Sequence, residues 1–127
     1  MVEIWTSHMS TRDPDRLDIT RKSAGPEGEP FAPSRELFMK TISARGPVKP
    51  WRAPSAAEEA AWTTFVPVYV EEMRVSYRRH RAAWERVLAR ARVVFVCYCL
   101  RADRCHRSIL SGLFGKCGAT VRGELAA

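Results

Sequence analysis

Residues 92–110 read RVVFVCYCLRADRCHRSIL, in which an apolar run is followed by a short charged link and then by Cys, His and Arg in succession. The run at 92–99 is rich in valine and aromatic residues, which is typical of a strand buried on both faces. Asp103 is a suitable N-cap for a helix over 104–116. Because a buried strand leads directly into a helix, the stretch indicates an α/β fold with a largely parallel sheet.

The rest of the chain also alternates strands and helices. Short β-prone stretches at 2–6 and 16–20 predict two strands, and the glycines and prolines at 22–33 predict a loop. A helix capped by a serine is expected over 34–45, and 119–125 predicts a last short strand. These elements predict a single Rossmann-like α/β domain that takes up the whole 127-residue chain, with helices flanking a mostly parallel sheet.

The clearest helical pattern follows a proline-rich linker at 46–54. Ser55 and Glu58 form an S-x-x-E capping box, after which apolar residues recur at spacings of three and four. A helix of that length exceeds the usual span of so small a domain, so we expect a break or kink at Pro67 and another within 76–80. The apolar stripe predicts core packing, and the arginines off the stripe predict a solvated face.

Composition excludes several classes of protein. The longest apolar run, 93–100, is far shorter than the roughly 20 residues that span a bilayer, so no membrane partner is expected. The start of the chain lacks the basic and apolar regions of a secretory signal, which predicts a cytoplasmic protein with free thiols.

Cys97 and Cys117 are expected to be small buried residues. The net charge of +7 favours polyanionic partners, a nucleotide or nucleic acid.

The predicted topology brings reactive side chains to one edge of the sheet. Cys99 would end the buried strand, and Cys105, His106 and Arg107 would lie in the first turn of the next helix. Free backbone N–H groups and the positive end of the helix dipole bind anions there and stabilise a thiolate. We therefore predict Cys99 or Cys105 as a reactive thiol and His106 as its proton acceptor or donor.

Other residues complete the predicted site. Asp18, in the second strand, is predicted to join the catalytic group by orienting a base or sugar. Arg107 is expected to be solvent-accessible, because its predicted partner is an exchangeable phosphate. The predicted ligand-binding residues are Arg21, Arg104, Arg107 and Ser108. No cofactor is predicted. No metal is predicted either, because adjacent side chains on a helix point about 100° apart, which would keep Cys105 and His106 from binding one ion.

Three functions remain open at this point. An enzyme would place Cys105 and Arg107 in a concave pocket together with a polar group from 18–22. A non-catalytic nucleic-acid-binding module would instead present an open basic surface. A thiol or metal sensor would hold Cys97 or Cys99 near Cys105.

Several stretches are similar to one known family. VFVCYCLRADRCHRSIL at 94–110 resembles the C-terminal signature of the family called domain of unknown function 488, in which an aliphatic strand ending in Cys leads to a C-H-R helix start. LDITR at 17–21, FAPSREL at 31–37 and WTTFVPVYVEEM at 62–73 resemble further segments of that family. The resemblance implies a small α/β domain and names no activity.

Overall fold

A four-stranded sheet forms one layer of the computed structural model, which describes residues 1–127. All of its pairings are parallel, and the strands lie in the order β2-β3-β1-β4. The strands are β1 (Glu3–His8), β2 (Arg16–Asp18), β3 (Arg92–Cys97) and β4 (Thr120–Glu124). The predicted α/β fold with a parallel sheet is confirmed, and the most apolar strand, β3, is buried as predicted and lies inside the sheet.

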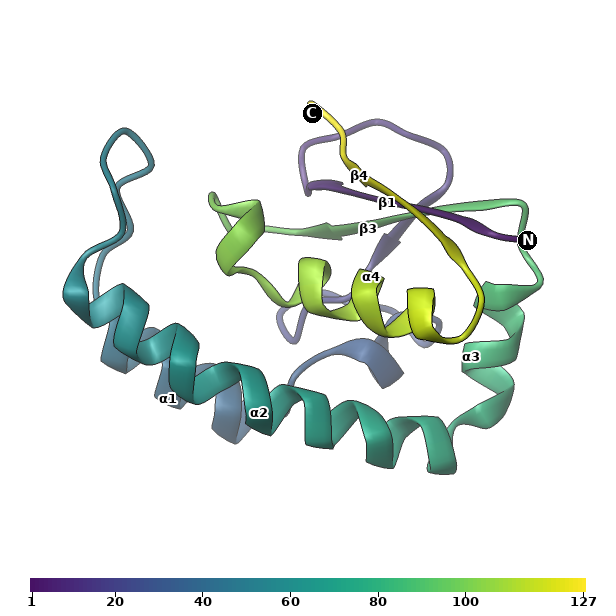
Figure 1. Ribbon diagram of the computed structural model, residues 1–127, viewed down its shortest axis with the longest axis horizontal. Helices are drawn as coiled ribbons and strands as arrows, with labels where there is room; N and C mark the ends of the chain where they lie inside the picture. Colours follow the sequence, from purple (N-terminus) through teal and green to yellow (C-terminus); the bar gives the residue numbers. More distant parts are fainter.

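Helices make up the second layer. They are α1 (Arg35–Arg45), α2 (Ala56–Arg79), α3 (Arg81–Leu88) and α4 (His106–Lys116), with short 3₁₀ helices η1 (Glu29–Phe31) and η2 (Ala102–Arg104). In Figure 1, α4 lies between the sheet and the long helix α2. None of these helices has both the length and the apolar character required to cross a bilayer.

Local signals account for the starts of the first two helices. The Ser34 hydroxyl accepts the N–H of Leu37 at the start of α1. At the start of α2, the Ser55 hydroxyl accepts the N–H of Glu58, whose carboxylate accepts the N–H of Ser55 in return. Both caps satisfy N–H groups that the first turn of a helix leaves free, which is why these predicted boundaries are confirmed.

The long helical segment breaks once, at His80 and not at Pro67. Pro67 lies on the exposed side of α2, where water can bind the Thr63 carbonyl that the proline leaves without a donor. At His80 the backbone leaves the helical region with φ −121° and ψ 39°. Trp84 then folds back and donates its indole N–H to the Ser76 hydroxyl at 3.1 Å. The helix therefore continues through Pro67 without a break, and the predicted break within 76–80 is confirmed.

The predicted loop at 22–33 contributes to the core. It contains η1, and Phe31 from this helix is fully buried against the rings of Trp84, Phe95 and Phe114. Sixteen buried apolar residues from the sheet and the helices form one cluster around these rings. The loop is thereby anchored in the hydrophobic core.

The start of α4 differs from the prediction. The helix begins at His106, preceded by Cys105 in an extended conformation with φ −137° and ψ 146°. Asp103 belongs to η2 and caps no helix. The side chain of Arg104 pairs instead with Glu59 on α2, so tertiary contacts hold the link as a separate turn. Cys105 is therefore the residue before the helix and does not belong to its first turn.

Candidate functional site

A pocket of about 410 Å³ opens at the carboxyl edge of the sheet. The loops after β2 and β3, the two helices α1 and α2, and the start of α4 all contribute to its lining. The apolar part of the lining includes Phe38, Ile42, Ala61, Trp62 and Phe65. Parallel α/β sheets bind ligands at this edge, so the pocket lies where the topology predicts a site.

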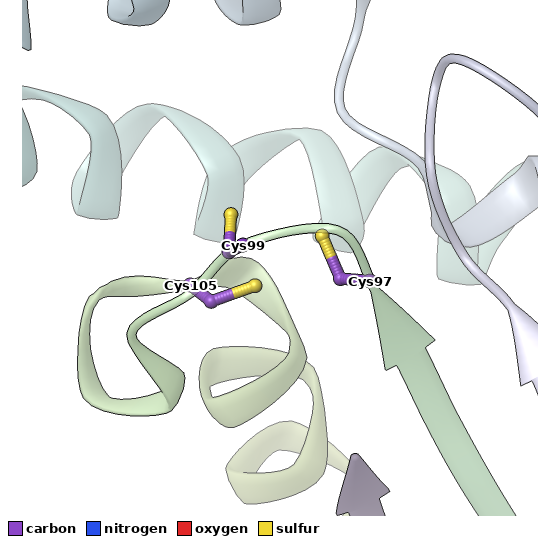
Figure 2. Close-up of side chains that lie close together, drawn as sticks. All are labelled: Cys97, Cys99 and Cys105. Atoms are coloured by element: carbon purple, nitrogen blue, oxygen red, sulfur yellow. The ribbon is translucent and has the colours of Figure 1, made fainter. Parts of the chain in front are cut away.

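Three cysteine sulfurs meet beside this pocket. Cys97 ends β3, Cys99 lies in the following loop, and Cys105 immediately precedes α4 (Figure 2). The Sγ atoms all lie within 4.8 Å of one another. Cys97 and Cys105 are buried and Cys99 is half-buried, while Cys117 is exposed, contrary to the prediction that it is buried. The chain therefore brings together the thiols that a sensor was expected to hold close.

His106 completes the cluster. Its Nε2 lies 2.8 Å from the carbonyl oxygen of Ile19, which can only accept a hydrogen bond, so Nε2 carries the proton. Nδ1 then faces the sulfurs of Cys97 and Cys105 at 3.9 and 3.8 Å. Burial opposes a charged imidazole, but hydrogen bonds to Cys97 and Ile19 raise the pKa of His106 overall. Cys105 and His106 converge because Cys105 is extended, so the predicted divergence of these side chains was wrong.

The thiols differ in how readily they ionise. Hydrogen bonds from Cys105 and Cys97, followed by the charges of His106 and Arg45, hold the pKa of Cys99 well below its ordinary value. The pKa of Cys105 is raised, chiefly by burial. The pKa of Cys97 is also raised, chiefly by its hydrogen bonds to the other two cysteines. The surroundings therefore favour ionisation of Cys99, the most accessible of the three thiols.

Arg45, at the end of α1, approaches Cys99 from the opposite wall. Its Nη1 lies 4.0 Å from the Cys99 sulfur, and its buried Nε has no hydrogen-bond partner in the protein. Sequence analysis did not identify Arg45, because a basic residue in the last turn of a helix is common. Only the fold brings this side chain to the thiols.

Arg107 is buried, contrary to the prediction that it is solvent-accessible. Only 2% of its surface is exposed. Its Nε and Nη2 donate to the carboxylate of Glu124 at 3.2 and 2.9 Å, and Nη1 donates to the carbonyl of Cys99 at 3.0 Å. Glu124 also accepts the hydroxyl of Thr6. The guanidinium is thus engaged by the protein and does not line the pocket, so Cys105, Thr20 and Arg21 meet the arrangement expected of an enzyme and Arg107 does not.

Residues 3–118 match the family model described as the Active DUF488-N3 subclade. The chain belongs to the DUF488 family. The match covers almost the whole chain and confirms the resemblance that was drawn from the C-H-R segment and from the segments at 17–21, 31–37 and 62–73. Neither a curated protein nor a solved structure matches the chain.

Besides Arg107, two of the predicted residues, Asp18 and Ser108, lie outside the pocket of this DUF488 protein. The carboxylate of Asp18 accepts hydrogen bonds from Thr20 and from the Ser23 hydroxyl, which shapes the loop after β2. Ser108 is exposed, and its hydroxyl donates to the carbonyl of Cys105 at 2.8 Å. Both side chains organise backbone near the site without facing the pocket.

Arg21 and Arg104 do line the pocket, although each has partners within the protein. Arg104 forms two hydrogen bonds to Glu59, at 2.9 and 3.2 Å. Arg21 donates to the carbonyl of Pro33 at 2.9 Å and lies 3.6 Å from the carboxylate of Glu29. The other cations in the lining are Lys22, Arg45 and Arg101. The DUF488 pocket therefore combines apolar walls, several cationic side chains and one thiol, Cys99, with a lowered pKa.

Proposed function

We propose that this DUF488 protein is a thiol-dependent enzyme that uses Cys99 as its nucleophile on a phosphate-bearing ligand. The position of the Cys99 sulfur carries this proposal. It lies in the lining of the pocket, within 4.8 Å of two other thiols and 4.0 Å from the Arg45 guanidinium. Neighbouring thiols and a cation stabilise a thiolate, which is the nucleophilic form of cysteine.

The proposed reaction needs no group beyond the chain and water. The Cys99 sulfur gives an electron pair to an electrophilic atom of the ligand, and a leaving group departs with the pair that bound it. Water then attacks the same atom, and the bond to sulfur breaks so that the thiolate is restored. His106 is the proposed proton carrier and acts through Cys97 and Cys105, because its Nδ1 faces their sulfurs.

The pocket lining supports a ligand with an anionic part and a flat apolar part. Arg45 and Lys22 line the pocket and have no carboxylate partner, with the Lys22 ammonium 5.1 Å from the centre of the Tyr98 ring, so these two cations are available to a phosphate. Trp62 and Phe65 offer aromatic surface to a base. A nucleotide, or one nucleotide of a nucleic acid, combines these features. Asp18 is proposed to support this site indirectly, by holding the loop that carries Arg21 and Lys22.

The test is the alkylation rate of each cysteine at neutral pH, measured by mass spectrometry in reduced protein with EDTA present. Cys99 should react at least ~10-fold faster than Cys117, the exposed thiol that serves as an internal reference. Inorganic phosphate or a nucleoside monophosphate should protect Cys99 and leave Cys117 unaffected. If Cys99 reacts no faster than Cys117, the enzyme proposal fails.

Arg45→Ala tests the anion-binding part separately. It should slow the alkylation of Cys99 and remove protection by phosphate, because both effects depend on the cation beside the sulfur. Arg74→Ala is the matched control, since Arg74 lies on the exposed face of α2 and does not line the pocket. Equal protection in Arg45→Ala and the parent protein would contradict a phosphate site at Arg45.

A further inference from the structure

We propose that Cys97, Cys99, Cys105 and His106 form a four-ligand binding site for a thiophilic divalent cation, with Zn²⁺ as the expected ion. This inference rests on the geometry of the cluster and does not depend on the proposed enzyme activity. The four residues offer three sulfurs and one imidazole nitrogen. A Cys₃His donor set is one of the usual tetrahedral zinc sets.

The spacing of the sulfurs is close to that of a tetrahedral site. Zinc–sulfur bonds of about 2.3 Å place two thiolates about 3.8 Å apart. The three Sγ atoms lie within 4.8 Å of one another without a metal to draw them together. Cys99 lies in a loop outside helices and strands, so a small shift of this residue can close the remaining gap (Figure 2).

His106 is oriented as a metal ligand would be. Tetrahedral zinc separates a ligating nitrogen from a ligating sulfur by about 3.6 Å. The Nδ1 atom lies 3.9 Å from Cys97 Sγ and 3.8 Å from Cys105 Sγ. Because the Nε2–H group donates a hydrogen bond to the Ile19 carbonyl, the lone pair of Nδ1 faces the sulfurs. Backbone carbonyls fix the tautomer of zinc-bound histidines in this way.

The surroundings balance the charge of such a site and give access to it. Three thiolates and a neutral imidazole around Zn²⁺ carry a net negative charge. The Nη1 atom of Arg107 lies 3.5 Å from Cys105 Sγ, and that of Arg45 lies 4.0 Å from Cys99 Sγ. All four candidate ligands line the pocket, which provides an entry path from solvent. The sulfur-rich donors favour zinc over magnesium or calcium.

Metal binding would oppose thiol chemistry in this site. A bound cation withdraws electron density from the Cys99 sulfur, which makes the sulfur a weaker nucleophile towards a substrate. The same four side chains would therefore give the protein a reactive metal-free form and a less reactive metal-bound form. Zinc should slow the alkylation of Cys99 and leave that of Cys117 unchanged.

Cobalt(II) is the probe for the donor set, because tetrahedral thiolate ligation gives Co²⁺ intense absorption bands that Zn²⁺ lacks. Reduced, metal-free protein titrated with Co²⁺ should develop these bands up to one equivalent, and Zn²⁺ should then remove them. A parent protein that develops no bands would overturn the proposal. This failure would leave the enzyme proposal standing, because the alkylation of Cys99 is measured separately in EDTA.

Substitutions of the candidate ligands test which side chains bind the metal ion. Cys97→Ser and His106→Gln should each weaken Zn²⁺ binding by at least ~10-fold in competition with a chromophoric chelator, since even residues behind the ligands contribute that much. Cys117→Ser is the control and should bind as the parent does. Melting curves of the metal-free variants confirm folding, and if one variant is unfolded the other decides. Unchanged Zn²⁺ affinity in the folded variants, or loss of binding in Cys117→Ser, would overturn the assignment.

Discussion

Arg107 and Glu124 form a bidentate ion pair that joins the start of α4 to the end of β4, with N–O distances of 3.2 and 2.9 Å. The remaining guanidinium nitrogen of Arg107 donates to the carbonyl of Cys99. One buried side chain therefore connects the thiol loop, the helix behind it and the C-terminal strand. This pair, and not an exchangeable anion, accounts for the arginine of the C-H-R segment.

Arg107→Ala should destabilise the protein by about 3 kcal/mol, because it removes the cationic partner of the Glu124 carboxylate and the donor to the Cys99 carbonyl. Urea unfolding measures the change. Arg122→Ala is the matched control, since Arg122 and its partner Glu3 are both exposed and such pairs contribute about 0–1 kcal/mol. Equal midpoints for Arg107→Ala and Arg122→Ala would contradict a structural role for Arg107.

Leu110→Ala should cost about 2–5 kcal/mol through the cavity that it leaves, because Leu110 is fully buried in the core. Thermal melting and urea unfolding both report this loss. Val121→Ala provides the comparison, as Val121 is largely exposed on β4 and should change stability by less than ~0.5 kcal/mol. A similar loss in the two variants would mean that α4 does not pack on the sheet as described.

Glu58 should make the protein sensitive to acid. Burial raises the pKa of this carboxyl, but the Ser55 N–H and Arg101 together lower it below its ordinary value of 4.5. A lowered folded-state pKa stabilises the protein above pH 4.5, and this stability is lost as the pH falls through the folded value. Glu58→Gln should therefore be less stable at pH 7 and show a shallower loss below pH 4.5. Parallel stability curves for the two proteins from pH 7 to pH 3 would count against this linkage.

Binding to nucleic acid, where it occurs, should weaken steeply as salt is added and depend little on sequence. The exposed arginines of α2 and α3 are Arg74, Arg78, Arg79, Arg81 and Arg86, and they do not line the pocket. Contacts between such cations and phosphates release counterions, which makes affinity salt-dependent. Fluorescence anisotropy with two unrelated single-stranded oligonucleotides at two salt concentrations measures the effect. Undetectable or salt-independent binding would remove support for a nucleic-acid-binding module.

Much of the fold follows from local signals. The valine-rich run of β3 and the caps at Ser34 and Ser55 specify a buried strand and two helix starts through contacts a few residues long. The start of α4 could not be predicted in this way. Asp103 is a good cap by itself, but ion pairs between the link and α2 hold it in a separate turn. Interactions with distant residues outweigh a single capping bond there.

In the candidate site, too, some features follow from the local sequence and others depend on contacts between distant segments. Cys97, Cys99, Cys105 and His106 lie within ten residues, so the sequence by itself determined that they lie near the end of a buried strand, but not that their side chains would meet. Their geometry depends on the extended backbone of Cys105 and on the Ile19 carbonyl that orients His106. Arg45 and Glu124 come from segments far apart in the chain. Only the tertiary structure decided which arginine faces the pocket and which is buried, because a guanidinium is positioned by the partners that packing brings within hydrogen-bond distance.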